Sequence, residues 1–189
     1  KTPLSEIQDQ SLAIEVTKRR LQEPGCDRVS IICELIAKRD VDLPYLLQKI
    51  PLDGLEEDIN IMSALLERLK TGPGLVLDDE KNVLYDMEFT KRFRLARQAD
   101  LSWSEAVAYG RESAYYLTQW NNGKFDISEL SALDARLQAE LHWQIPQNRM
   151  EIIQALFKNQ NVPTQDILRF FSSRTALTPL EMSTAAQLL

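Results

Sequence analysis

The sequence is poor in glycine, histidine and cysteine, with six, one and two of these residues among 189. Few positions can therefore adopt a positive φ, which favours helices over a fold built from many tight turns. Zinc sites usually combine several histidines and cysteines, and His142 is the only histidine in the sequence. We therefore expect no metal site and no bound cofactor.

Residue patterns typical of enzymes are missing as well. No glycine-rich phosphate-binding loop is present, because Gly72 and Gly74 flank a proline and no Gly-Lys-Ser/Thr follows them. A Ser-His-Asp site would have to use His142, which lies beside Leu141 and Trp143 near the end of an expected helix. We therefore predict that the chain is not an enzyme.

Long apolar runs are also absent. None reaches the roughly 18 residues of a membrane-spanning helix, and the first residues lack the pattern of a signal peptide. On one helix, Cys26 and Cys33 would lie roughly 10 Å apart, too far for a disulfide. The sequence starts at Lys1 without methionine and stops within an expected helix, which indicates a piece of a longer protein. We expect an intracellular protein, cytoplasmic or nuclear, that does not enter a membrane.

What the chain does contain is apolar residues at helical spacing, which predict a mainly α-helical protein. Proline, glycine and capping residues divide this pattern into segments. The expected helices span residues 4–22, 28–38, 44–50, 55–70, 102–120, 149–159 and 164–171, with a further helix from 126 to the break at Ile145–Pro146 and another from 178 onward.

One segment between these helices has the pattern of β-strands. Val83, Tyr85, Met87 and Phe89 are apolar at every second position, as in a half-buried strand. With the polar turn before them, they predict a β-hairpin over residues 72–89. Three short helices followed by a hairpin would form a winged helix-turn-helix. The alternative is a plain helical bundle with an irregular loop.

The apolar pattern of residues 29–50 occurs again 121 positions later, in residues 150–171. This repeat predicts a second helix-turn-helix unit, truncated at its C-terminus, although two unrelated amphipathic helix pairs could also coincide. We therefore expect an N-terminal helix and a winged-helix-like unit over residues 1–98, and a helical unit over residues 99–189, joined by longer helices. The matched pairs are Ile31 with Ile152, Ile32 with Ile153, Leu35 with Leu156, Ile36 with Phe157, Val41 with Val162, Leu46 with Ile167, Leu47 with Leu168 and Ile50 with Phe171.

The net charge of −6 is unusual for a DNA-binding domain, because such domains neutralise phosphates with basic residues. Glu56, Glu57 and Asp58 fall in the first turn of the expected recognition helix over residues 55–70, where they would repel phosphates. We therefore predict a non-enzymatic scaffold, regulatory or protein–protein interaction module of a larger assembly. Its partner would be a basic or amphipathic protein.

Aromatic residues of the expected helix over residues 102–120 are the candidate protein interface. They exceed what one core-facing stripe needs, and aromatic side chains anchor many interfaces. The alternative is a central helix buried on most sides. The candidates are Trp103, Tyr109, Tyr115, Tyr116 and Trp120.

A basic stretch over residues 89–97 supports an alternative function in nucleic-acid binding. Cations mixed with aromatic rings can hold a phosphate backbone and stack on bases. The protein would then be a winged-helix domain, or an accessory domain of a nucleic-acid-processing enzyme. A segment that buries its rings and pairs its cations with carboxylates would explain the same pattern. The candidate residues are Lys91, Arg92, Phe93, Arg94 and Arg97.

Overall fold

The computed structural model describes residues 2–71, 75, 77–119, 150, 153–154, 157, 162–172 and 177–189. Over these residues the protein is mainly α-helical, as predicted, and contains no strand. The chain forms two compact units, one comprising Lys1–Asp78 and Phe93–Ala108 and the other Asp79–Arg92 and Tyr109–Leu189. The division predicted near residue 98 stays a prediction.

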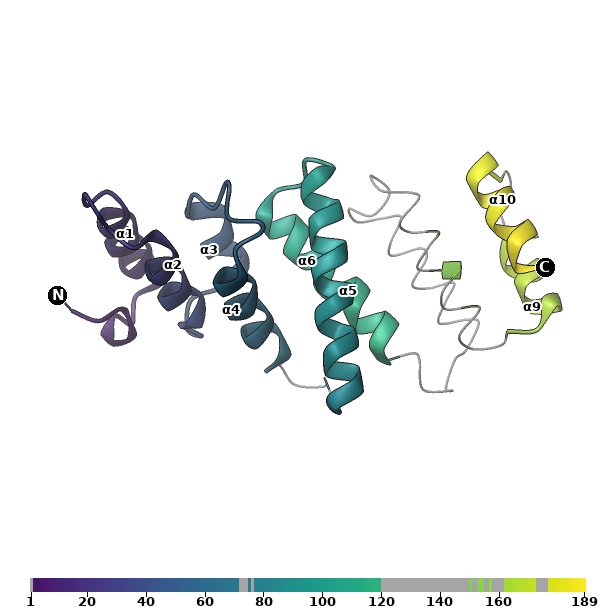
Figure 1. Ribbon diagram of the computed structural model, residues 1–189, viewed down its shortest axis with the longest axis horizontal. Helices are drawn as coiled ribbons and strands as arrows, with labels where there is room; N and C mark the ends of the chain where they lie inside the picture. The colour runs from purple at the N-terminus through teal and green to yellow at the C-terminus, as the bar shows by residue number, and fades with distance from the viewer. Residues whose placement is uncertain are drawn as a thin grey trace. The chain divides into compact units, whose positions relative to one another are not determined.

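The first unit starts with a short 3₁₀-helix and four α-helices (Figure 1), and an aspartate caps each of the four α-helices. The carboxylates of Asp9, Asp27, Asp42 and Asp58 accept hydrogen bonds from backbone N–H groups that have no partner within the helix. The helices are the 3₁₀-helix η1 (Leu4–Glu6), then α1 (Gln10–Leu21), α2 (Arg28–Ala37), α3 (Leu43–Lys49) and α4 (Ile59–Lys70).

Two predicted helix starts are wrong, and the aspartate caps explain why. The helix expected over residues 4–22 is interrupted before Asp9, which caps α1, and only η1 precedes the break. The helix expected from residue 55 begins at Ile59, because the Asp58 carboxylate binds the N–H groups of Asn60 and Ile61. The expected helices over residues 28–38 and 44–50 are confirmed as α2 and α3.

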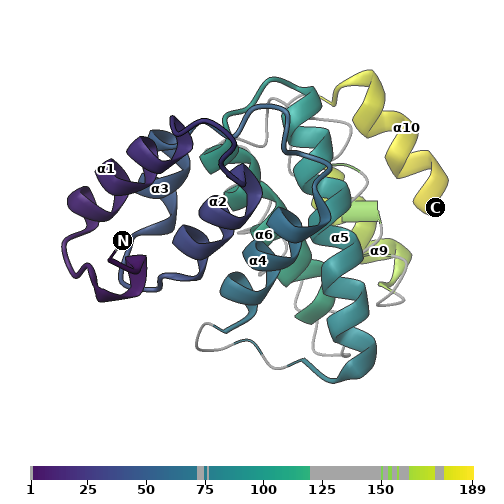
Figure 2. The ribbon, with the colours of Figure 1, turned by 60° about the vertical axis from the view of Figure 1, so that its left-hand side comes forward.

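Helix α2 is the centre of the first unit and lies between α1 and α4 (Figures 1 and 2). Its Ile32, Leu35 and Ile36 are fully buried. Arg68 of α4 donates hydrogen bonds to the carbonyls of Ile36 (3.0 Å), Lys38 (3.2 Å) and Val41. These bonds satisfy carbonyl groups at the end of α2 and in the turn that follows it.

The predicted β-hairpin is wrong, since residues 79–98 form one long helix, α5 (Asp79–Gln98). Tyr85 and Phe89 are buried, whereas Val83 and Met87 are 59% and 64% exposed. In a strand, all four side chains would share one face, but in a helix these pairs lie on opposite sides. The alternating pattern therefore comes from two helical stripes with a spacing of four. The wing of the predicted winged helix is not present in the described part of residues 72–89.

Helix α6 (Trp103–Gln119) follows α5 and confirms the helix expected over residues 102–120. Its start has the predicted capping box, in which the Ser102 N–H donates to Glu105 and the Glu105 N–H donates to the Ser102 hydroxyl, both at 3.2 Å. Gly110 lets α6 approach α5, because a Cβ at this position would lie 3.1 Å from the Phe89 ring and its carbonyl oxygen.

The second unit has a core rich in phenylalanine. Helices α9 (Thr164–Ser172) and α10 (Pro179–Leu188) confirm the expected helices over residues 164–171 and from 178. The Phe157 and Phe170 rings pack edge to face with centroids 5.4 Å apart. The helix expected from residue 126 lies outside the described residues. One buried cluster of this unit consists of Leu117, Met150, Ile153, Phe157, Ile167, Phe170 and Phe171.

Burial of the repeated positions can be compared where both members of a pair are described. Leu47 is buried while Leu168 is 51% exposed, and Val41 is buried while Val162 is partly buried. Ile152 and Leu156 lie outside the described residues. In the other four pairs both side chains are buried: Ile32 with Ile153, Ile36 with Phe157, Leu46 with Ile167 and Ile50 with Phe171.

Two alanine substitutions on α5 test its helical conformation. Phe89→Ala should lower the free energy of unfolding by about 3–5 kcal/mol, because it leaves a cavity. Val83→Ala should change it by less than about 0.5 kcal/mol, because Val83 is exposed. Urea denaturation followed by circular dichroism measures the free energy of unfolding of both variants. Similar losses at both positions would indicate a shared strand face and contradict the helix.

Candidate functional site

The rings of the basic stretch belong to the protein core. Phe89 and Phe93 are fully buried, and Phe93 packs against Trp103 with ring centroids 4.9 Å apart. Arg92 is also buried, and its Nε lies 3.2 Å from Glu88 Oε2, one helical turn earlier. Of the five nucleic-acid candidates, Lys91 and Arg94 are the exposed ones.

Arg94 and Arg97 pair with carboxylates in the turn before α4. Arg94 Nη2 lies 2.8 Å from Glu57 Oε2, in a pair that is largely exposed. Arg97 Nη2 lies 2.8 Å from Glu56 Oε1 and 3.5 Å from Asp53 Oδ1. The basic end of α5 and the acidic turn therefore neutralise each other within the first unit.

Arg97 has further partners besides its carboxylates. Its Nη1 donates to the carbonyl of Leu101 at 2.7 Å, and its guanidinium lies over the Trp103 ring, 5.8 Å from the centroid. The Arg97 side chain is only 21% exposed and that of Glu56 25%. Arg97 therefore joins the α3–α4 turn to the segment between α5 and α6.

The structure corrects the predicted position of the acidic residues. Glu56 and Glu57 lie before α4 rather than in its first turn, and Asp58 is its N-cap. Desolvation acts to raise the pKa of Glu56, but the hydrogen bond from Arg97 opposes it, and the pKa is lowered from 4.5. A lowered pKa in the folded state means that this carboxylate stabilises the protein above its ordinary pKa, and that the stabilisation is lost as the pH falls.

Three of the five aromatic interface candidates have described side chains, and they differ in burial. Trp103 and Tyr109 are buried, and Tyr115 is 40% exposed. The side chain of Tyr116 and all of Trp120 lie outside the described residues. The surplus of aromatic residues on this helix is explained, for Trp103 and Tyr109, by burial.

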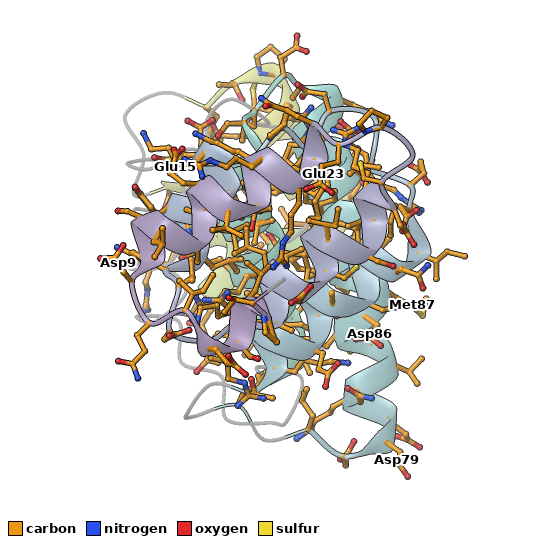
Figure 3. The ribbon with its side chains drawn as sticks, turned by 90° about the vertical axis from the view of Figure 1, so that its left-hand side faces the viewer. Asp9, Glu15, Glu23, Asp79, Asp86 and Met87 are labelled. Carbon is orange, nitrogen blue, oxygen red and sulfur yellow. The ribbon has the colours of Figure 1, made fainter. Side chains whose placement is uncertain are left out.

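Sequence reasoning missed an exposed apolar surface on α5. Val83 and Met87 lie one turn apart and point away from buried Tyr85 and Phe89. We call Val83 and Met87 the α5 apolar pair. Figure 3 shows Met87 with Asp79 and Asp86 on the same helix. A helical rather than a strand interpretation of residues 83–89 would have identified the pair from the sequence.

Within the described part of the chain, no group of three or more His, Cys, Asp or Glu side chains could hold a metal ion. The helices described by the structure include none with the length and apolar character needed to cross a membrane.

No protein-family model matches the chain, and neither a curated protein nor a solved structure matches it. The function must therefore be inferred from the side chains themselves.

Alanine substitutions of two arginines on α5 test the internal ion pairs. Arg97→Ala should lower the free energy of unfolding by about 1–3 kcal/mol, because it leaves a partly buried carboxylate without its hydrogen bond. Arg94→Ala should cost no more than about 0.5–1 kcal/mol, because its pair with Glu57 is exposed. Chemical denaturation at neutral pH measures both. Equal costs would show that Arg97 is not a structural residue.

Proposed function

We propose that the chain is a non-enzymatic module that binds another protein, as a scaffold or regulatory part of a larger assembly. The observation that carries this proposal is the internal engagement of the basic stretch. Arg92, Arg94 and Arg97 each pair with a carboxylate of the chain, and the Phe93 ring is buried. Three of the four candidate cations and the one candidate ring therefore already have partners within the chain.

Nucleic-acid binding through residues 89–97 would have to disrupt this arrangement. Arg94 and Arg97 would exchange their carboxylate partners for phosphates, and Phe93 would have to leave the core before it could stack on a base. Exposing a buried phenylalanine costs about 1.5–3 kcal/mol in transfer free energy alone. Binding would therefore begin with a penalty that a free basic surface does not carry.

The α5 apolar pair is the surface that we propose for the partner. Burying the exposed side chains of Val83 and Met87 could contribute up to about 1.5–3 kcal/mol each. The acidic residues Asp79 and Glu80 at the start of α5 lie one turn before the pair. An amphipathic protein segment with basic residues beside its apolar face would complement this surface.

We also propose that the two helical segments of the repeat are copies of one structural unit. Four pairs of positions that are buried in both copies support this interpretation. Packed helical units of this kind suit a scaffold, because a preorganised surface lowers the conformational cost of binding. An intracellular location is consistent with the two free cysteines, Cys26 and Cys33.

Site-specific cross-linking in source cells tests the proposed function. A photoreactive p-benzoylphenylalanine at position 87 should cross-link a stoichiometric protein partner, and the same residue at exposed Gln98 on α5 should not. The double substitution Val83→Asp with Met87→Asp should reduce partner recovery by about tenfold or more, because it places charges in the apolar contact.

Gln98→Asp is the matched control, since it adds a charge to the same helix outside the pair. Melting temperatures of all variants should agree within a few degrees, because the substituted side chains are exposed. If the double variant recovers as much partner as the unaltered chain, the proposed surface is contradicted. The absence of any protein partner would contradict the proposed function.

A further inference from the structure

An open groove of about 410 Å³ lies along one side of α1 in the first unit. Its apolar wall consists of Leu12 and Val16 of α1 and Ile7 from the preceding segment. Leu12 is 53% exposed, whereas Ala13 and Ile14 beside it are buried. Helix α1 therefore buries one face in the unit and leaves a second apolar strip open.

Charged residues line the groove near the C-terminal end of α1. Arg20 is already engaged, since it donates to the Thr2 carbonyl and lies 3.8 Å from Glu34. Arg19 is exposed, and its side chain has no hydrogen bond or ion pair within the described residues. Glu23 lies at the same end, beyond the end of α1 (Figure 3). The groove thus combines an apolar strip with one available cation, Arg19, and the carboxylate of Glu23.

The spacing of the groove residues defines the shape of a suitable occupant. Leu12, Val16 and Arg19 follow each other at four and three residues on one side of α1. At 1.5 Å per residue they extend over about 10 Å, or two helical turns. A second helix laid along α1 could place apolar side chains against Leu12 and Val16 and a carboxylate against Arg19.

We propose that this groove binds an acidic amphipathic helix of a protein partner. This inference rests on the proposed function and adds the chemistry of one partner segment. A carboxylate would form a charge-assisted bond with Arg19, whereas a basic segment would place a like charge against Arg19. The net charge of −6 opposes this docking only weakly, because charges farther away than about 8 Å are largely screened at physiological salt.

Two synthetic helical peptides serve as probes. Both are about four turns long and carry the same leucine stripe, but one has glutamates and the other lysines beside it. Fluorescence anisotropy at about 150 mM salt should show that the full chain binds the glutamate peptide at least tenfold more tightly than the lysine peptide. Leu12→Asp should abolish binding, because it puts a carboxylate into the apolar wall.

Charge reversal at Arg19 is the decisive variant. Arg19→Glu should weaken the glutamate peptide about tenfold or more and shift the preference towards the lysine peptide. Arg39→Glu is the matched control, because Arg39 is an exposed arginine outside the groove and also has no ion pair within the described residues. Circular dichroism should show that all three variants fold.

Several outcomes would overturn this inference. Equal affinity for both peptides, or equal effects of the Arg19 and Arg39 reversals, would show that Arg19 does not select the occupant. A dimer in sedimentation that Leu12→Asp dissociates would identify a second copy as the occupant. If neither peptide binds but the double substitution on α5 still reduces partner recovery, the groove inference alone is rejected. If no protein partner is recovered with the unaltered chain, the proposed function is rejected instead.

Discussion

Helix α5 buries Tyr85, Phe89, Phe93 and Ala96 at spacings of four, four and three residues. Each large buried side chain is worth about 1.5–3 kcal/mol in transfer free energy, a considerable share of the 5–15 kcal/mol that stabilises a typical domain. Removing this face from water therefore fixes the rotation of the helix about its axis. All the other side chains of residues 79–98 are oriented by that rotation.

The orientation of α5 determines which of its charges are available. Arg94 and Arg97 reach carboxylates before α4, and the buried Arg92 reaches Glu88 within the helix. The side opposite the buried face carries Val83 and Met87, which are exposed and apolar. The same helix thus pairs three of its arginines with carboxylates and leaves two apolar side chains exposed, and these two observations support the proposal of a protein partner.

Capping residues and apolar spacing predicted most helices. The ion pairs of the candidate site could not be predicted in this way, because they join residues that are distant in the sequence. The capping boxes that begin at Ser102 and Thr178 correctly marked the starts of α6 and α10. Period-two alternation over residues 83–89 fits a strand and two helical stripes equally well, and extending the pattern to Phe93 would have favoured the helix. The pairing of Arg97 with Glu56 joins residues 41 positions apart, which no local pattern indicates.

Binding of DNA by the full chain is the most direct test of the internal pairing of these charges. A labelled duplex and a labelled single strand are titrated with micromolar protein, starting at about 50 mM salt, where phosphate contacts are strongest. We predict no shift for either DNA, because the arginines are paired and the rings are buried. Binding that weakens steeply with salt and disappears in Arg94→Glu would show that residues 89–97 face a nucleic acid.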